Sequence, residues 1–220
     1  MLPYTLQELP LVAMALMIAF SVHEFAHAYV AYKFGDPTAQ KQGRLTLSPL
    51  SHIDPIGAIA IFLVGFGWAR PVPVNPHYFK RPRLAGILVS VAGPLSNLVL
   101  GTIGLIVVYG LVLSGAMGAL PEAVKITLQQ FFEIFIGLNI MLFVFNLIPL
   151  PPLDGYRIIE DLMPTHIRTK MTQYERYGAI IFLVLVITPL DRYTIQPIFH
   201  VVIPIVAESL RTFVRLLFGM

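Results

Sequence analysis

The sequence contains no cysteine, and only 12% of its 220 residues are charged, whereas 56% are hydrophobic. Without cysteine the chain has no disulfide framework and no thiolate ligand, so any metal ion must be bound by histidine and carboxylate side chains. So few charges and so many apolar residues exceed what a soluble domain needs to cover its surface. We therefore expect a polytopic membrane protein in a lipid bilayer.

The positive charges are scattered, and the net charge is only +3. This balance indicates no nucleic-acid partner, but the placement of the charges predicts the topology. Lys33, Lys41 and Arg44 follow the first apolar run, and the positive-inside rule makes that side cytoplasmic. The N-terminus is then expected outside a cell membrane.

The first apolar run contains the five residues HEFAH, from His23 to His27. Each ionisable residue near the middle of a bilayer costs about 2.5 to 3.5 kcal/mol on insertion scales, so three without a function there are not expected. On an α-helix His23 and His27 share one face and can bind zinc, while Glu24 can take a proton from water. The pattern favours a metalloprotease site inside the membrane, near its cytoplasmic side.

Apolar length predicts an all-α polytopic membrane protein with about five transmembrane helices. The expected spans are Leu6–Phe34, Leu84–Leu113, Ile126–Ile148, Tyr177–Leu190 and Ile195–Phe218. Residues 1–155 would form a catalytic transmembrane core. Residues 156–220 would form a charged cytoplasmic loop or surface helix and a transmembrane hairpin, with Arg211 and Arg215 near its cytoplasmic end.

Three segments between the first two long spans are expected to be irregular or extended. Pro55–Gly67 is too short to span and has positive residues on both sides, which favours a re-entrant segment. Gly43–Ser48 alternates like a short β-strand on the cytoplasmic side. Trp68–Pro76 contains three prolines and must be extended. It is either a stiff connector or an exposed edge that pairs with an unwound substrate.

Small residues recur at intervals of three and four along Leu84–Leu113, where they allow a neighbouring helix to approach closely. Asn97 lies in this stripe, within AGPLSN. Its amide is expected to make either a hydrogen bond between helices or a direct contact with substrate. Both interpretations are compatible with the sequence.

The segment LPPLDG, Leu150–Gly155, brings a carboxylate to the cytoplasmic end of the span that precedes it. Asp154 is either a third metal ligand or part of an ordinary Asp-Gly turn, and its depth, matched to HEFAH, favours the ligand. Asn146 is a packing amide or a contact to the scissile peptide. His52 opens the re-entrant segment and is a candidate for a substrate-facing or metal-supporting side chain.

Taken together, HEFAH, AGPLSN and NLIPLPPLDG resemble, in this order, the site-2 protease family of intramembrane zinc metalloproteases. Between these motifs no stretch is long enough for a PDZ or CBS domain, so the chain is most similar to the compact prokaryotic group. The resemblance implies one zinc ion held by His23, His27 and Asp154, with Glu24 as general base and Asn97 and Asn146 as substrate-facing amides.

These observations predict a zinc endopeptidase that hydrolyses a peptide bond in a transmembrane segment of another membrane protein. A membrane protein that binds or transports metal ions is the alternative, because it too would place histidine and aspartate in the membrane. Transport favours ligands along a path and repeated halves, and the sequence has neither. A catalytically silent scaffold is disfavoured, because every residue that the chemistry requires is present.

Overall fold

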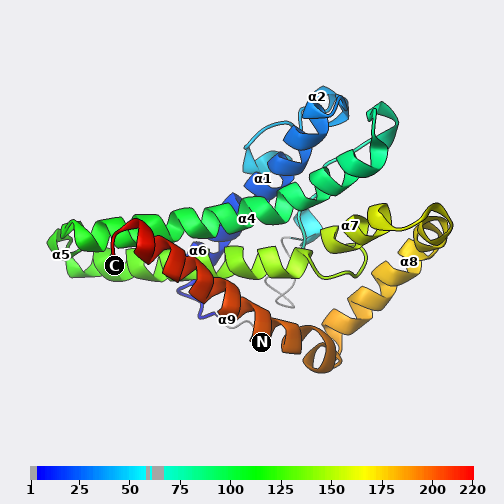
Figure 1. The fold of residues 1–220 in the computed structure, drawn as a ribbon. Helices are drawn as coiled ribbons and strands as arrows, with labels where there is room; N and C mark the ends of the chain where they lie inside the picture. The colour runs from blue at the N-terminus through cyan, green and yellow to red at the C-terminus, as the bar shows by residue number, and fades with distance from the viewer. Residues whose placement is uncertain (1–3, 58–59, 61–66) are drawn as a thin grey trace.

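The computed structural model describes residues 4–57, 60 and 67–220. Within these ranges the protein is helical and contains no sheet. Four helices are long and apolar enough to cross a membrane: α1 (Leu9–Lys33), α4 (Pro82–Leu113), α6 (Glu122–Asn146) and α9 (Asp191–Leu217). Shorter or more polar helices connect them (Figure 1), namely α2 (Thr38–Lys41), α5 (Ala116–Ala119), α7 (Asp154–Leu162), α8 (Thr165–Ile187) and the 3₁₀ turns η1 (Pro49–Ser51) and η2 (Pro76–Tyr78).

The first three predicted spans correspond to α1, α4 and α6, with ends that differ by a few residues. The fifth corresponds to α9, but the fourth, Tyr177–Leu190, is different. The charged segment before Tyr177 and the apolar segment after it form one helix, α8. Because Arg168, Lys170 and Glu175 lie in its first half, α8 is not among the four membrane-length helices of the described residues.

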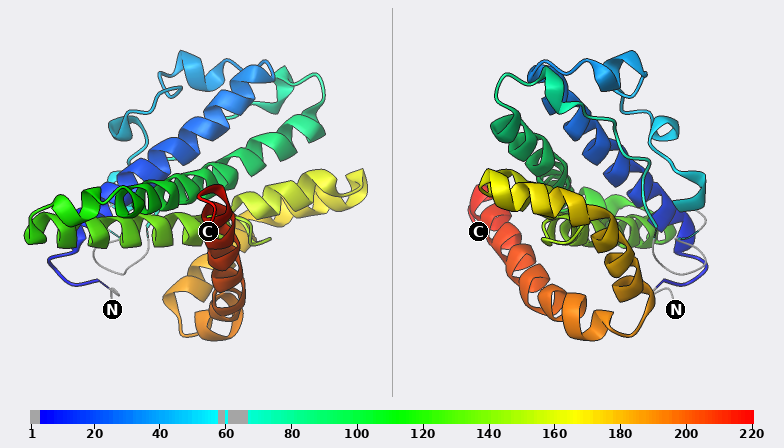
Figure 2. Two further views of the ribbon diagram at one scale, coloured as in Figure 1. Left: turned by 60° about the vertical axis from the view of Figure 1, so that its left-hand side comes forward. Right: turned by 90° about the vertical axis from the view of Figure 1, so that its right-hand side faces the viewer.

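Helices α1, α4 and α6 pack together as the core, and α4 contacts both of the others (Figures 1 and 2). The predicted small-residue stripe of α4 makes this possible: Ser90, Gly93, Gly101 and Gly104 are all buried. A Cβ on Gly104 would lie 2.8 Å from a side-chain carbon of Ile136 in α6, so any larger residue would displace that side chain. Close packing by small residues compensates for the weak hydrophobic driving force between helices in lipid.

Helices α8 and α9 form a V beside this core (Figure 1), and Phe182 and Ile195 join it to the end of α6. The C-terminal end of α9 lies beside the C-terminal half of α4, where Arg215 Nε donates to Tyr109 Oη at 3.2 Å. The prediction that Arg211 and Arg215 lie at the same end as Lys33 is therefore wrong. Since α8 leads away from the core, α9 crosses α4 at a steep angle and meets its C-terminal half only with its own C-terminal end (Figure 2).

The β-strand predicted at Gly43–Ser48 is also absent, because these described residues form bends and irregular chain. The neighbouring segment 68–75 contains no helix, as predicted, whereas Pro76 begins η2. Its prolines have no N–H to donate to a ladder. A single antiparallel bridge, Ile53 with Ala69, is the β-pairing recorded for the described residues. The predicted re-entrant segment Pro55–Gly67 falls largely on residues outside the described ranges.

Candidate metal centre

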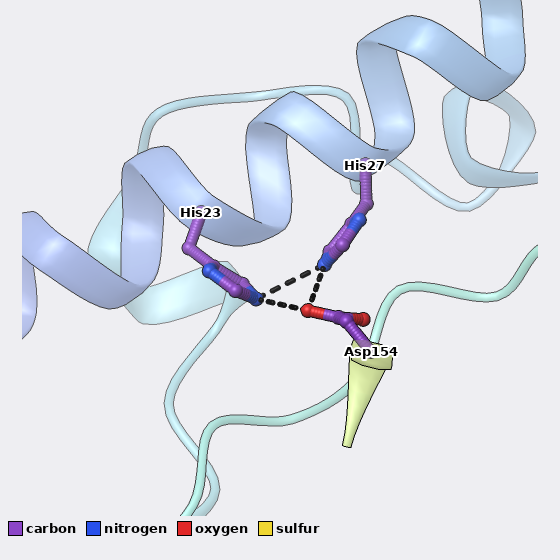
Figure 3. Close-up of side chains that lie close together, drawn as sticks. All are labelled: His23, His27 and Asp154. Atoms are coloured by element: carbon purple, nitrogen blue, oxygen red, sulfur yellow. Dashed lines mark hydrogen bonds and ion pairs between the residues drawn. The ribbon is translucent and has the colours of Figure 1, made fainter. Parts of the chain in front are cut away.

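Three side chains from two distant parts of the chain meet where α7 approaches α1 (Figure 3). His23 and His27 lie one helical turn apart on α1, and Asp154 is the first residue of α7. Asp154 Oδ2 lies 3.3 Å from Nε2 of each histidine, and the two Nε2 atoms are 3.0 Å apart. The structure thus brings together the three residues that the sequence suggests as ligands.

The geometry of these three atoms fits a zinc ion. Tetrahedral zinc with bonds of about 2.0 to 2.1 Å holds neighbouring ligand atoms about 3.3 Å apart, close to the observed separations. Asp154 Oδ2 is buried and has no hydrogen-bond partner among the described residues. A buried carboxylate oxygen without a partner is costly, and a cation between it and the two nitrogens would satisfy it. Two histidines and one carboxylate also leave a fourth position open.

Helix α4 holds the outer nitrogen of each histidine. His27 Nδ1 lies 2.7 Å from the carbonyl oxygen of Val89, and His23 Nδ1 lies 2.7 Å from Asn97 Oδ1. Both acceptors require a protonated Nδ1, which leaves a lone pair on each Nε2. Hydrogen bonds of this kind orient metal-binding histidines and raise their basicity.

Gly93 of α4 gives the two imidazoles the space that they occupy. A Cβ at this position would lie 2.3 Å from His27 Nε2 and 2.6 Å from His23 Cε1. These separations are far below ordinary contact, so no other residue fits without displacing the rings. The glycine that the sequence assigns to helix packing is therefore also part of the metal centre.

Asp154 reaches the site from the N-terminus of α7, and not from the loop turn that the sequence suggests. Gly155 is helical, and its role is close packing: a Cβ there would lie 2.3 Å from the carbonyl oxygen of Leu147.

Glu24 is buried beside the histidines and is held by the extended segment. Its Oε2 accepts a hydrogen bond of 2.7 Å from the backbone N–H of Val72. Arg44 fixes the same segment by donating to the carbonyl oxygen of Arg70 at 2.6 Å. The segment that the sequence suggests as a connector or a substrate edge thus contacts the candidate base directly.

The other predicted site residues lie farther from the metal position. Asn97 is fully buried between α1, α4 and α6, so it makes the inter-helix hydrogen bonds that were one of its two interpretations. Asn146 is partly buried and donates to Leu142 of its own helix at 2.9 Å. His52 is 1% exposed, binds the Thr46 carbonyl oxygen at 2.7 Å through Nε2, and lines an apolar cavity of about 170 Å³ beside α1.

Sequence reasoning missed three contributors to this site. Val72 contributes through its backbone, which no side-chain pattern reveals. Arg44 was used only as a topology signal, although its burial is itself unusual for a charged residue. Asn139 lies in the apolar C-terminal half of α6, and this placement was an available signal, because polar groups inside a membrane are costly unless they have a role.

Comparison with known proteins agrees with this site. The family model described as "Peptidase family M50" matches residues 11–189. "Putative zinc metalloprotease YwhC" of Bacillus subtilis is 58% identical over 198 residues, which cover 90% of this chain and 89% of that protein. "Putative zinc metalloprotease Rip2" of Mycolicibacterium smegmatis is 29% identical over 83% of this chain and 69% of that protein. No solved structure matches at comparable significance.

Proposed function

The chain belongs to peptidase family M50, the site-2 protease family, and is a zinc metalloprotease; from this premise we propose that it cuts transmembrane segments of other membrane proteins. The observation that carries the proposal is the cluster of His23, His27 and Asp154. Its two histidines lie on α1, one of the membrane-length helices. Because the matching family is a peptidase family, we propose a protease and not a metal transporter.

We assign the zinc ion to His23 Nε2, His27 Nε2 and Asp154 Oδ2, one ion per chain. When bound there, zinc supplies a Lewis acid that polarises the scissile carbonyl group and makes water more acidic. The hydrogen bonds at both Nδ1 atoms support this assignment, because they keep each Nε2 lone pair available.

Glu24 is the general base of the proposed reaction. Its Oε2 is bound by the Val72 N–H, so the carboxylate is fixed in one orientation and the other oxygen, Oε1, takes the proton from the attacking water. The protonated side chain then delivers this proton to the nitrogen of the leaving amine. A base fixed before the reaction avoids the cost of ordering it in the transition state.

The substrate must unwind locally before it is cut, because a helical backbone keeps its carbonyl groups inside the helix. We propose that Asn146 contacts this unwound segment, and that His52, which is 1% exposed, supports the site from the wall of the apolar cavity beside α1. Asn146 ends α6 just before the loop that leads to Asp154, and its partial exposure supports the role. Asn97, by contrast, acts on the substrate only through His23, since it is fully buried.

The four membrane-length helices and the family place the protein in a membrane. We propose that the active site opens toward the cytoplasm, because Lys33, Lys41 and Arg44 follow the end of α1 that carries His27, and Arg81 and Arg83 begin α4 at the same end. The cell membrane and this orientation are parts of the proposal.

The test compares the wild-type protein with Glu24→Gln and Asp154→Ala, each purified in detergent. We measure zinc content and the cleavage of a generic transmembrane peptide, with the cut position read by mass spectrometry. We expect one zinc and a cut within the apolar stretch for the wild type, one zinc without cleavage for Glu24→Gln, and loss of both for Asp154→Ala.

Glu122→Gln is the matched control, because it makes the same chemical change at an exposed position of α6. It is expected to bind zinc and cut like the wild type. Stoichiometric zinc after removal of both histidines would overturn the ligand assignment, and undiminished cleavage by Glu24→Gln would overturn the base. Cleavage confined to water-soluble peptides would refute the proposed substrate class.

A further inference from the structure

A chain of amide groups runs from α6 through α4 to the first histidine of α1. Asn139 Nδ2 donates to the Phe135 carbonyl oxygen at 2.8 Å, and Asn139 Oδ1 accepts from Asn97 Nδ2 at 3.1 Å. Asn97 Oδ1 then lies 2.7 Å from His23 Nδ1. Both asparagines expose none of their surface, so water does not take the place of any partner.

Each amide in the chain can point only one way. The Phe135 carbonyl oxygen is an acceptor, so it must face the NH₂ group of Asn139, which turns the Asn139 oxygen toward Asn97. That oxygen must face the NH₂ group of Asn97, which turns the Asn97 oxygen toward His23. The orientation of both amides is thus decided by a backbone carbonyl group of α6.

The direction of Asn97 decides the tautomer of His23. An oxygen at this position requires a proton on Nδ1 and leaves Nε2 free to bind metal. If the Asn97 amide turned over, its NH₂ group would face Nδ1, and the proton would move to Nε2, where it competes with zinc. The contact of Asn97 Nδ2 with the Ala19 carbonyl oxygen is 3.4 Å long, too weak to fix the amide without Asn139.

We propose that Asn139 is a positioning residue that holds His23 in its zinc-binding tautomer through Asn97. The inference rests on the proposed function, because it needs His23 to be a zinc ligand. Asn139 touches neither zinc nor substrate. It belongs to α6, which supplies no ligand, so the packing of the third core helix prepares the site on the first.

The experiment measures zinc affinity by chelator competition for the wild type and for His23→Ala, Asn139→Leu and the double variant Asn97→Asp/Asn139→Leu. Leucine fills the space of asparagine without a hydrogen bond. Asn139→Leu is expected to weaken zinc binding by about 10- to 100-fold, the usual effect of removing a partner that orients a metal ligand. The double variant is expected to recover most of this loss, because a carboxylate offers His23 an acceptor whichever oxygen faces it.

A second measurement reads the tautomer without metal or activity. In zinc-free protein labelled with ¹⁵N-histidine, NMR distinguishes a protonated Nδ1 from a protonated Nε2, and His23→Ala identifies the signal of His23. We expect the Nδ1–H form in the wild type and in the double variant, and a shift toward the Nε2–H form in Asn139→Leu. Asn139→Ala is the second variant, with the same expectation, in case leucine does not fit.

Thr102→Val in α4 is the control, since it removes a hydroxyl group whose hydrogen bond runs to Leu98 of its own helix. It is expected to leave both measurements unchanged. The proposal is overturned if His23→Ala weakens zinc binding while Asn139→Leu does not, or if the double variant shows no recovery, because lost packing would then explain the effect. If His23→Ala binds zinc like the wild type, the ligand assignment itself fails, a result distinct from both.

Discussion

Replacing Gly93 by alanine is expected to remove zinc while leaving α4 intact. The added Cβ would lie 2.3 Å from His27 Nε2, 2.4 Å from His27 Cε1 and 2.6 Å from His23 Cε1. Alanine is favoured over glycine in a helix by about 1 kcal/mol, so the helix itself is not weakened. The change therefore acts on the space that the two imidazoles need.

The size of the effect follows from these distances. Ordinary contact begins at 3.4 Å, so His27 Nε2 would have to withdraw by about 1.1 Å. Metal sites tolerate deviations of only about 0.2 Å in their ligand distances. Since losing a residue that merely orients a ligand already costs about 10- to 100-fold in affinity, we expect Gly93→Ala to lower zinc affinity by at least about 100-fold.

The assay is chelator competition on protein purified in detergent, with thermal unfolding of the zinc-free protein measured alongside. Gly101→Ala is the matched control: it lies on the same stripe of α4, but its Cβ would meet the nearest atom at 3.6 Å, an ordinary contact. We expect near wild-type zinc affinity for this control. Wild-type affinity in Gly93→Ala, or equal losses in both variants, would refute the argument that the glycine makes room for the ligands.

Three further outcomes are expected. Val72→Pro removes the N–H that binds Glu24 and is expected to lower kcat by about 10- to 100-fold, equivalent to the 1.5 to 3 kcal/mol of a hydrogen bond to a charged group, with zinc content unchanged. Val72→Ala keeps the N–H and is expected to cut normally; equal activity of both would contradict the role of this bond. Asp36 is 1% exposed and accepts from the Asn75 N–H at 2.6 Å, so Asp36→Ala is expected to reduce the free energy of unfolding by about 1 to 3 kcal/mol in chemical denaturation, and an unchanged value would contradict it. Removing zinc by chelation is expected to lower the thermal midpoint, because a ligand at 100 times its Kd adds about 2.7 kcal/mol; identical midpoints with and without zinc would argue against a site formed only in the folded state.

Local sequence patterns predicted those parts of the site that lie on a single helix face, either of α1 or of α4. The spacing of His23 and His27 determines that they share a face of α1, and the recurrence of small residues determines which face of α4 is buried. Both follow from the helical period alone. The three apolar runs that became α1, α4 and α6 were predictable for the same reason, since their length is set by the thickness of the bilayer.

Features that depend on how separate segments meet were not predictable. Gly155 was expected to make a turn, but its glycine is needed for the approach of α7 to the Leu147 carbonyl oxygen, which depends on the tertiary structure. The direction of α9 depends on where α8 ends, and charge counts alone gave the wrong end for Arg215. The hydrogen bond from Val72 to Glu24 joins a backbone group to a side chain 48 residues away.

The same contacts that pack the core also prepare the metal centre. Val89 and Asn97 bind the outer nitrogens of the histidines only when α4 lies against α1. Asp154 comes from outside this pair, on α7, and its approach depends on the packing of Gly155 against the end of α6. Zinc affinity therefore reports on two packings against α4: that of α1, which aligns the nitrogens, and that of α7, which supplies the carboxylate. A substrate that displaced α7 would weaken the site through Asp154 alone and leave both histidines aligned.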